Sequence, residues 1–247
     1  MRTKPPSYIY SKVFFKERKL IGIMCAMVEE LEPILEKVDI KEKIRHGNNI
    51  YYVAEYEGKN TVLAYSKIGK VNAAITATAM IERFGIKKLL FSGVAGAIDE
   101  DLKIGDLIAA THVCQHDVDL SVFGYKYGFI PESEIYFDCD INLITLAKKV
   151  AEKMDIKLKT GIIASGDQFV HSKERKKWIK EVFGASAIEM EGGAVGCVAW
   201  NYSVPFFMLR AISDTAEEGA GVDFDAFLEE SSKVSAKFLL EMLKEIK

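Results

Sequence analysis

The sequence has few cysteines, no long apolar run and no excess of basic charge, and each absence excludes a class of protein. Its four cysteines are scattered among 247 residues and form no C-x-x-C pair, which is typical of a reduced, cytoplasmic protein. No apolar run reaches the roughly 18 residues that a membrane-spanning helix needs. The net charge is −3, whereas nucleic-acid-binding domains usually present a basic face. We therefore expect a cytoplasmic protein whose partner is neither a membrane nor a nucleic acid.

Common motifs for phosphate binding and nucleophilic catalysis are also absent. Neither the G-x-x-x-x-G-K phosphate loop nor the G-x-G-x-x-G dinucleotide turn occurs in the chain. The order of side chains expected for a serine–histidine–aspartate triad is absent as well. The chain is nevertheless 49% apolar, so it can bury a sizeable core, and its chemistry has to come from other side chains.

Strand and helix patterns alternate along the chain, which predicts an α/β fold. Continuous apolar runs at 20–27, 88–92 and 204–212 are typical of parallel strands buried on both faces. Helices are expected to follow several polar N-cap residues, namely Asp140, Ser172 and Asp223. No linker or repeat divides residues 20–247, so we expect one domain.

Residues 1–19 differ from the rest of the chain. They carry six basic residues against the single acid Glu17, and Pro5 and Pro6 disfavour a helix. Their apolar part is interrupted by lysines and no small-residue cleavage site follows, as a signal peptide would require. We interpret residues 1–19 as an N-terminal extension.

Two carboxylates stand where a strand passes into a helix, at Glu189 and Glu191. Residues two apart on a strand point to one face, and ligands of open α/β sheets gather at the carboxyl ends of strands. A sugar diol could satisfy both acids, since each hydroxyl can donate to a carboxylate. The alternative is a solvated strand end with two surface acids.

Two further acids follow predicted strands. Glu30 comes just after the first apolar run, and Asp214 ends the last one, four residues after Arg210 and therefore on the same strand face. An acid in the first turn of a helix also favours the helix dipole, so Glu30 has a purely structural alternative. The small-residue segment 93–97 is predicted to be a turn that lets a ligand approach the backbone closely. A pair of carboxylates with separated pKa values suits acid–base attack on a glycosidic bond.

Three other patterns have competing interpretations. His112, Cys114 and His116 alternate and could share one strand face as zinc ligands, but no fourth ligand is evident. The basic helix after Ser172 is interpreted as a solvated face, the alternative being a nucleic-acid site. The aromatic loop at 117–139 is long enough to suggest a functional segment or an interface.

Four segments together resemble the bacterial 5′-methylthioadenosine/S-adenosylhomocysteine nucleosidases: 66–71, 92–96, 188–191 and 210–214. The resemblance extends from about Leu20 to the C-terminus. It implies a single-domain, three-layer α/β fold of the purine nucleoside phosphorylase type, with a curved mixed β-sheet surrounded by helices. It also implies a homodimer that uses no cofactor and no metal.

The resemblance carries over a set of catalytic roles. Asp214 would protonate N7 of the adenine leaving group, with Ser213 holding its carboxylate. Glu30 would activate the attacking water, helped by Arg210. Many members of the family have a serine near this water where the present chain has Val94, so water positioning would depend on Glu30 and Arg210.

The resemblance also implies the binding residues. Glu191 and the Met190 backbone would hold the ribose hydroxyls, Phe169 would stack on adenine, and Val170 would contact the edge of the base. The 5′-alkylthio pocket would be lined by Ile68, Met190 and Phe224, and Phe123 and Pro131 would reach it from the partner subunit. The substrate site would further include Glu189, Val94, Ala95 and Gly96.

Substrate choice and reaction type have alternatives. Segments 115–121, 128–133 and 166–175 look most like a branch that also cleaves 6-amino-6-deoxyfutalosine and serves menaquinone synthesis as well as methionine salvage. A nucleoside phosphorylase of the same fold would need cationic groups for phosphate, but residues 22–36 contain no Arg or Lys. A non-catalytic adenosine-binding protein would have no use for a base at Glu30.

Overall fold

The computed structural model describes residues 20–216 and 220–247, so the predicted extension at 1–19 lies outside the described residues. Within the described part, ten strands form one mixed sheet. They are β1 (Ile21–Cys25), β2 (Asp39–His46), β3 (Asn49–Tyr56), β4 (Lys59–Tyr65), β5 (Lys88–Ala97), β6 (Leu107–Gln115), β7 (Tyr136–Asp138), β8 (Leu158–Ser165), β9 (Ala185–Glu189) and β10 (Phe206–Asp214). The helices are α1 (Val28–Leu35), α2 (Lys70–Glu82), α3 (Ile141–Met154), α4 (Lys173–Phe183), α5 (Gly192–Asn201) and α6 (Ala220–Glu245), with a 3₁₀ turn at Ser121–Phe123.

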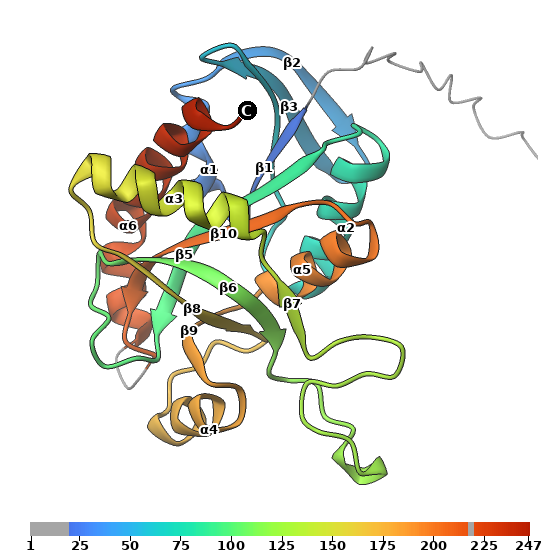
Figure 1. Cartoon of the computed structure of the whole chain (residues 1–247), viewed down its shortest axis with the longest axis vertical. Helices are drawn as coiled ribbons and strands as arrows, with labels where there is room; N and C mark the ends of the chain where they lie inside the picture. Colours follow the sequence, from blue (N-terminus) through green and yellow to red (C-terminus); the bar gives the residue numbers. More distant parts are fainter. Residues whose placement is uncertain (1–19, 217–219) are drawn as a thin grey trace, which may run out of the picture.

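The sheet is strongly curved because part of it closes on itself. β10 pairs with both β5 and β6, so that β5, β9, β8, β6 and β10 form a ring. β1, β4, β3 and β2 extend from β5 as an open wing. Helices α1, α3 and α6 lie on one side of the sheet, and α2 and α5 pack together on the other (Figure 1). The curved mixed sheet between helices confirms the predicted three-layer fold.

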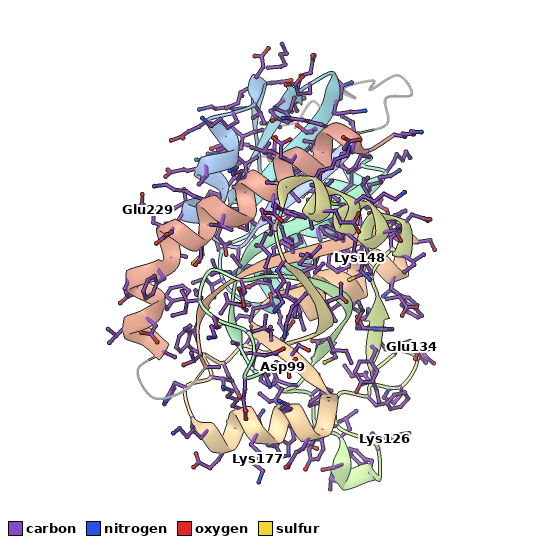
Figure 2. The ribbon with its side chains drawn as sticks, turned by 60° about the vertical axis from the view of Figure 1, so that its left-hand side comes forward. Asp99, Lys126, Glu134, Lys148, Lys177 and Glu229 are labelled. Carbon is purple, nitrogen blue, oxygen red and sulfur yellow. The ribbon has the colours of Figure 1, made fainter. Side chains whose placement is uncertain are left out.

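The core is built from the apolar runs that the sequence shows. β1, β5 and β10 are parallel neighbours, and every residue of β1 and β10 is buried. Their carboxyl ends therefore meet at one place inside the molecule, as parallel strands require. By contrast, most charged side chains of the helices are exposed, among them Lys148, Lys177 and Glu229, which Figure 2 labels. In the described segments, no helix combines the length and apolar character needed to cross a bilayer.

Several predicted helix ends are confirmed. Asp140 accepts hydrogen bonds from the amides of Asn142 and Leu143 at the start of α3, and Ser172 accepts one from the Arg175 amide at the start of α4. The basic helix α4 does present a solvated face, on which Lys177 pairs with Glu181.

Other predicted boundaries are wrong. Residues 93–97 do not form a turn but continue β5 to Ala97. Helix α6 already includes Ala220, so Asp223 lies in its first turn and is not its N-cap. β2 and β7 were not predicted, because β2 is a charged edge strand with mostly exposed residues and β7 has only three residues.

Candidate active site

A cavity lies where the carboxyl ends of β1, β5 and β10 meet the end of β9. Loops after β4 and β8 and the first turn of α6 complete its wall. Its lining contains the side chains or backbone of Ala26, Met27, Glu30, Ile68, Val94, Ala95, Gly96, Gln168, Phe169, Val170, Ile188, Glu189, Met190, Glu191, Ser213, Asp214 and Phe224. Convergent carboxyl groups within an otherwise apolar cavity are the usual mark of an active site.

Glu30 is buried at the N-terminus of α1 and held by three backbone amides. Its Oε2 accepts hydrogen bonds from Ala26 at 2.7 Å and Met27 at 2.9 Å, and its Oε1 accepts one from Val94 at 2.9 Å. Burial raises its pKa above the ordinary value, although the charge of Arg210 and the three amides act in the opposite direction. Because Met27 is the N-cap of α1, Glu30 both caps the helix and lines the cavity, and the two interpretations of this residue are compatible.

Glu189, which lines the cavity, forms a buried ion pair with Arg210, which lies behind the cavity wall. Their N–O distance is 2.8 Å, and their side chains are only 1% and 4% exposed. The carboxylate of Glu189 also accepts hydrogen bonds from the Ser165 hydroxyl and from the backbone amides of Glu191 and Gly192. Glu189 therefore fixes the turn between β9 and α5, and the charge of Arg210 is already compensated within the protein.

Glu191 faces the cavity from the residue before α5. Its Oε1 accepts a hydrogen bond of 2.8 Å from the Gly69 amide. Burial and the nearby charge of Glu189 raise the pKa of Glu191 to about 8. Because Glu189 and Glu191 are 8% and 5% exposed, the alternative of two solvated surface acids is wrong.

Asp214 ends β10 and is also buried. Its Oδ1 accepts a hydrogen bond of 2.7 Å from the Ala216 amide, and its Oδ2 accepts one of 3.1 Å from the Ser213 hydroxyl. Burial is the largest cause of its raised pKa. The pairing of β10 with β5 shifts in register between Ile212 and Asp214, so Asp214 lies beside Gly96 whereas Arg210 lies beside Gly93 and Glu30.

Glycines of β5 make room for these acids. A Cβ atom at Gly93 would overlap the carboxylate of Glu30, and one at Gly96 would lie 2.7 Å from Oδ1 of Asp214. The sequence predicted that a ligand could approach this backbone closely. In the structure, the carboxylates of Glu30 and Asp214 are the groups that lie against it. Their positions depend on the absence of two side chains.

Apart from Gln168 and Ser213, the remaining wall of the cavity is apolar. Phe169 and Phe224 meet edge to face with ring centroids 5.8 Å apart. Ile68, Met190 and Val170 line the same space. A flat base and an apolar substituent could both be accommodated by such a surface.

The structure brings together most of the predicted site residues. All of them line the cavity except Arg210, Phe123 and Pro131. Arg210 lies behind the wall, and Phe123, 72% exposed on the 3₁₀ turn, is on the outer surface with Pro131. The sequence reasoning missed Ala26, Met27, Gln168 and Ile188. Gln168 and Ile188 are next to predicted site residues, whereas Ala26 and Met27 lie four and three residues before Glu30.

The metal hypothesis for His112, Cys114 and His116 is wrong. His112 lies 3.1 Å from the carboxylate of Asp138, whereas His116 lies beside Arg175. Burial raises the pKa of Cys114 to about 12, so its thiol is not poised to ligate. Across residues 20–216 and 220–247, no group of three or more His, Cys, Asp or Glu side chains could hold a metal ion.

Comparison with known proteins identifies similar chains over nearly the whole length. The sequence profile of the phosphorylase superfamily matches residues 20–244. An aminodeoxyfutalosine nucleosidase of Helicobacter pylori strain J99 is 53% identical over 227 residues, which are 92% of this chain and 99% of that protein. A 5′-methylthioadenosine/S-adenosylhomocysteine nucleosidase of Staphylococcus carnosus is 40% identical over 228 residues, which are 92% of this chain and all of the other. The native structure of futalosine hydrolase of H. pylori strain 26695 superposes with a TM-score of 0.91 and 53% identity, covering 92% of this chain and 98% of that one.

Proposed function

This chain belongs to the phosphorylase superfamily, and on that premise we propose that it hydrolyses the N-glycosidic bond of 5′-substituted adenosines. The products are adenine and the 5′-substituted ribose. The substrates are 5′-methylthioadenosine, S-adenosylhomocysteine, 5′-deoxyadenosine and 6-amino-6-deoxyfutalosine. The names of the relatives at 53% and 40% identity support the nucleosidase activity and, among these substrates, aminodeoxyfutalosine, methylthioadenosine and S-adenosylhomocysteine.

The observation that carries the proposal is the pair of buried carboxyl groups at Glu30 and Asp214. Burial is the largest cause of the raised pKa of Asp214, and a raised pKa is the direction that suits an acid donating a proton to N7 of the departing adenine. Glu30 accepts a proton from the attacking water, which then adds to the ribose carbon. The nearby negative carboxylates stabilise the positive charge that develops on the sugar in the transition state.

Binding roles follow from the places of the lining residues. Glu191 and the Met190 backbone hold the ribose hydroxyls, while Glu189 and Arg210 keep this segment and the site of the water in place. Phe169 stacks on adenine beside Val170 and Ser213. Ile68 and Phe224 contact the apolar 5′ substituent, and the backbone at 94–96 forms the floor.

Hydrolysis is favoured over phosphorolysis by the charges at the site. Among the described residues that line the cavity there is no Lys or Arg. Arg210, which lies behind the wall, already pairs with Glu189 at 2.8 Å. A phosphate dianion would therefore meet carboxylates without a free cation, whereas water can be accommodated there.

The proposal includes an assembly and a cellular setting. The exposed Phe123 and Pro131 of the aromatic loop reach the cavity of a second copy, forming a homodimer. Exposed apolar residues of α2, Val71 and Ile75, support such an interface. The enzyme acts in the cytoplasm without a cofactor, in methionine salvage and menaquinone biosynthesis.

The deciding experiment is adenine release, followed by chromatography, from methylthioadenosine and from aminodeoxyfutalosine, each with and without phosphate. We expect adenine from both substrates at rates that do not depend on phosphate. Adenine that appears only with phosphate would replace this proposal with a phosphorylase. Binding of both nucleosides without any release would instead indicate a non-catalytic adenosine-binding protein.

A further inference from the structure

Three segments that frame the mouth of the cavity are joined to one another outside it. The loop at 66–70 carries Ile68, the loop at 166–170 carries Phe169, and Asp117 follows the end of β6. Neither Asp117 nor the other two residues that make the connections, Lys70 and Asp167, lines the cavity.

The three residues form a closed cycle of hydrogen bonds. The Lys70 ammonium donates to Oδ1 of Asp117 at 2.6 Å. Oδ2 of Asp117 accepts from the Asp167 amide at 2.9 Å, and Oδ1 of Asp167 accepts from the Lys70 amide at 2.8 Å. Each residue is therefore bonded to both of the others, and no segment can move without breaking two of the three bonds.

The central ion pair is more sheltered than an ordinary surface pair. The side chains of Lys70 and Asp117 are 16% and 13% exposed. Burial opposes ionisation of Asp117, but the bonds from Lys70 and the Asp167 amide outweigh it, and its pKa lies below the ordinary value. A sheltered ion pair with extra hydrogen bonds holds its geometry better than exposed pairs, which contribute little.

The cycle also determines where a neighbouring amide points. Gly69, next to Lys70, has a left-handed φ of +98° and donates its amide proton to Oε1 of Glu191. A Cβ atom on Gly69 would lie 3.0 Å from Oδ1 of Asp167. Gly69 is thus held between two carboxylates, one at the mouth of the cavity and one in the cycle.

We infer that Asp117 is a positioning residue for substrate binding, acting through Lys70 and Asp167. It fixes the Gly69 amide on the ribose-binding Glu191, and it fixes the loop that carries Phe169 and Val170 over the base. This role rests on the proposed function, because it assigns the two loops to the ribose and adenine of the substrate. Since Asp117 touches neither Glu30 nor Asp214, its loss weakens binding more than it slows the chemical step.

The test compares Asp117→Asn, Lys70→Met and the double variant with the wild-type protein. Asparagine keeps the size of the side chain and removes its charge. Lys153→Met is the matched control, because Lys153 of α3 pairs with Glu245 of α6 at 2.7 Å and neither residue lines the cavity. The readouts are KM and kcat for adenine release from methylthioadenosine, together with amide hydrogen exchange of peptides covering 66–70 and 166–170.

We expect Asp117→Asn to raise KM by about tenfold, equivalent to ~1.4 kcal/mol, and to lower kcat by less than about threefold. Exchange in both peptides should accelerate. The double variant should also show an increase in KM of about tenfold and not the product of the two single effects, because residues of one network are not additive. Lys153→Met should change neither kinetics nor exchange in these peptides.

Accelerated exchange in both peptides with an unchanged KM would overturn the positioning role and leave the cycle as a purely structural feature. A loss confined to kcat, or single effects that multiply in the double variant, would overturn it as well. If the wild-type protein releases no adenine, the proposed function fails. The exchange measurement needs no substrate, so it separates that failure from the failure of the cycle itself.

Discussion

Replacing Gly96 by alanine tests whether the missing side chain in β5 sets the position of Asp214, the proposed catalytic acid. The new Cβ would lie 2.7 Å from Oδ1 of Asp214 and 3.1 Å from Cβ of Ala216, whereas ordinary contacts begin at 3.4 Å. The carboxylate cannot simply rotate away, because Oδ1 also accepts the Ala216 amide at 2.7 Å. Asp214 must therefore shift by several tenths of an ångström.

A displacement of that size should be visible mainly in the rate of adenine release. A misplacement of about 1 Å in an active site can cost about 100-fold in rate, and we expect kcat/KM of Gly96→Ala to fall by about 30- to 100-fold, or ~2–2.7 kcal/mol. Overpacking a core typically costs about 1–3 kcal/mol. We therefore also expect Tm to fall by several degrees in calorimetry.

Gly221→Ala is the matched control for this substitution. Gly221 lies in the first turn of α6, where an added Cβ meets nothing within 4 Å. Alanine in a helix is favoured over glycine by about 0.5–1 kcal/mol, so Tm should stay equal or rise while kcat/KM stays unchanged. A Gly96→Ala protein with wild-type kcat/KM would refute the argument that the glycine makes room for Asp214.

Four further predictions follow from the same geometry. Asp214→Asn keeps the acceptor for the Ala216 amide but cannot donate a proton, so kcat should fall by about 10³-fold with an unchanged Tm; unchanged kinetics would remove Asp214 as the acid. Glu30→Gln should lose a similar factor in kcat and still bind methylthioadenosine in calorimetry, whereas loss of binding would assign Glu30 a structural role only. Besides burial, the charge of Asp223 helps to raise the pKa of Asp214, and the proposed mechanism requires the protonated acid. Asp223→Asn should therefore lower that pKa and move the alkaline fall of the kcat profile to lower pH; a shift to higher pH would contradict the assignment. A protein consisting of residues 20–247 should release adenine at the full-length rate, and an inactive fragment would give residues 1–19 a role in the enzyme.

Much of the fold could be predicted because apolar strands and helix caps are local signals. The runs at β1, β5 and β10 were evident since each strand is buried on both faces, and Asp140 and Ser172 mark helix starts through bonds within three residues. The charged strand β2 was missed, because its stability comes from pairing with β3 and not from burial of its own side chains.

Most residues of the candidate site could be predicted from the sequence, but the contacts between them could not. The acids were found because they follow apolar runs. The segment 93–97 was mistaken for a turn because glycine and alanine usually leave regular structure, whereas here they admit carboxylates from α1 and β10. The pairing of Arg210 with Glu189 joins residues 21 positions apart on different strands, and no local pattern indicates such a contact.

The four buried carboxyl groups of the cavity lie in different electrostatic environments, which suits the different roles proposed for them. Glu189 is compensated by Arg210 at 2.8 Å. The other three acids have raised pKa values for which burial is the largest cause, but their neighbours differ. Arg210 lowers the pKa of Glu30, whereas Asp223 raises that of Asp214. The charges of Arg210 and Asp223 thus act in opposite directions on the proposed base and the proposed acid, which is the sense that these two roles require. As free side chains both are ordinary carboxylic acids, so the proposed division of roles between Glu30 and Asp214 has to come from their surroundings.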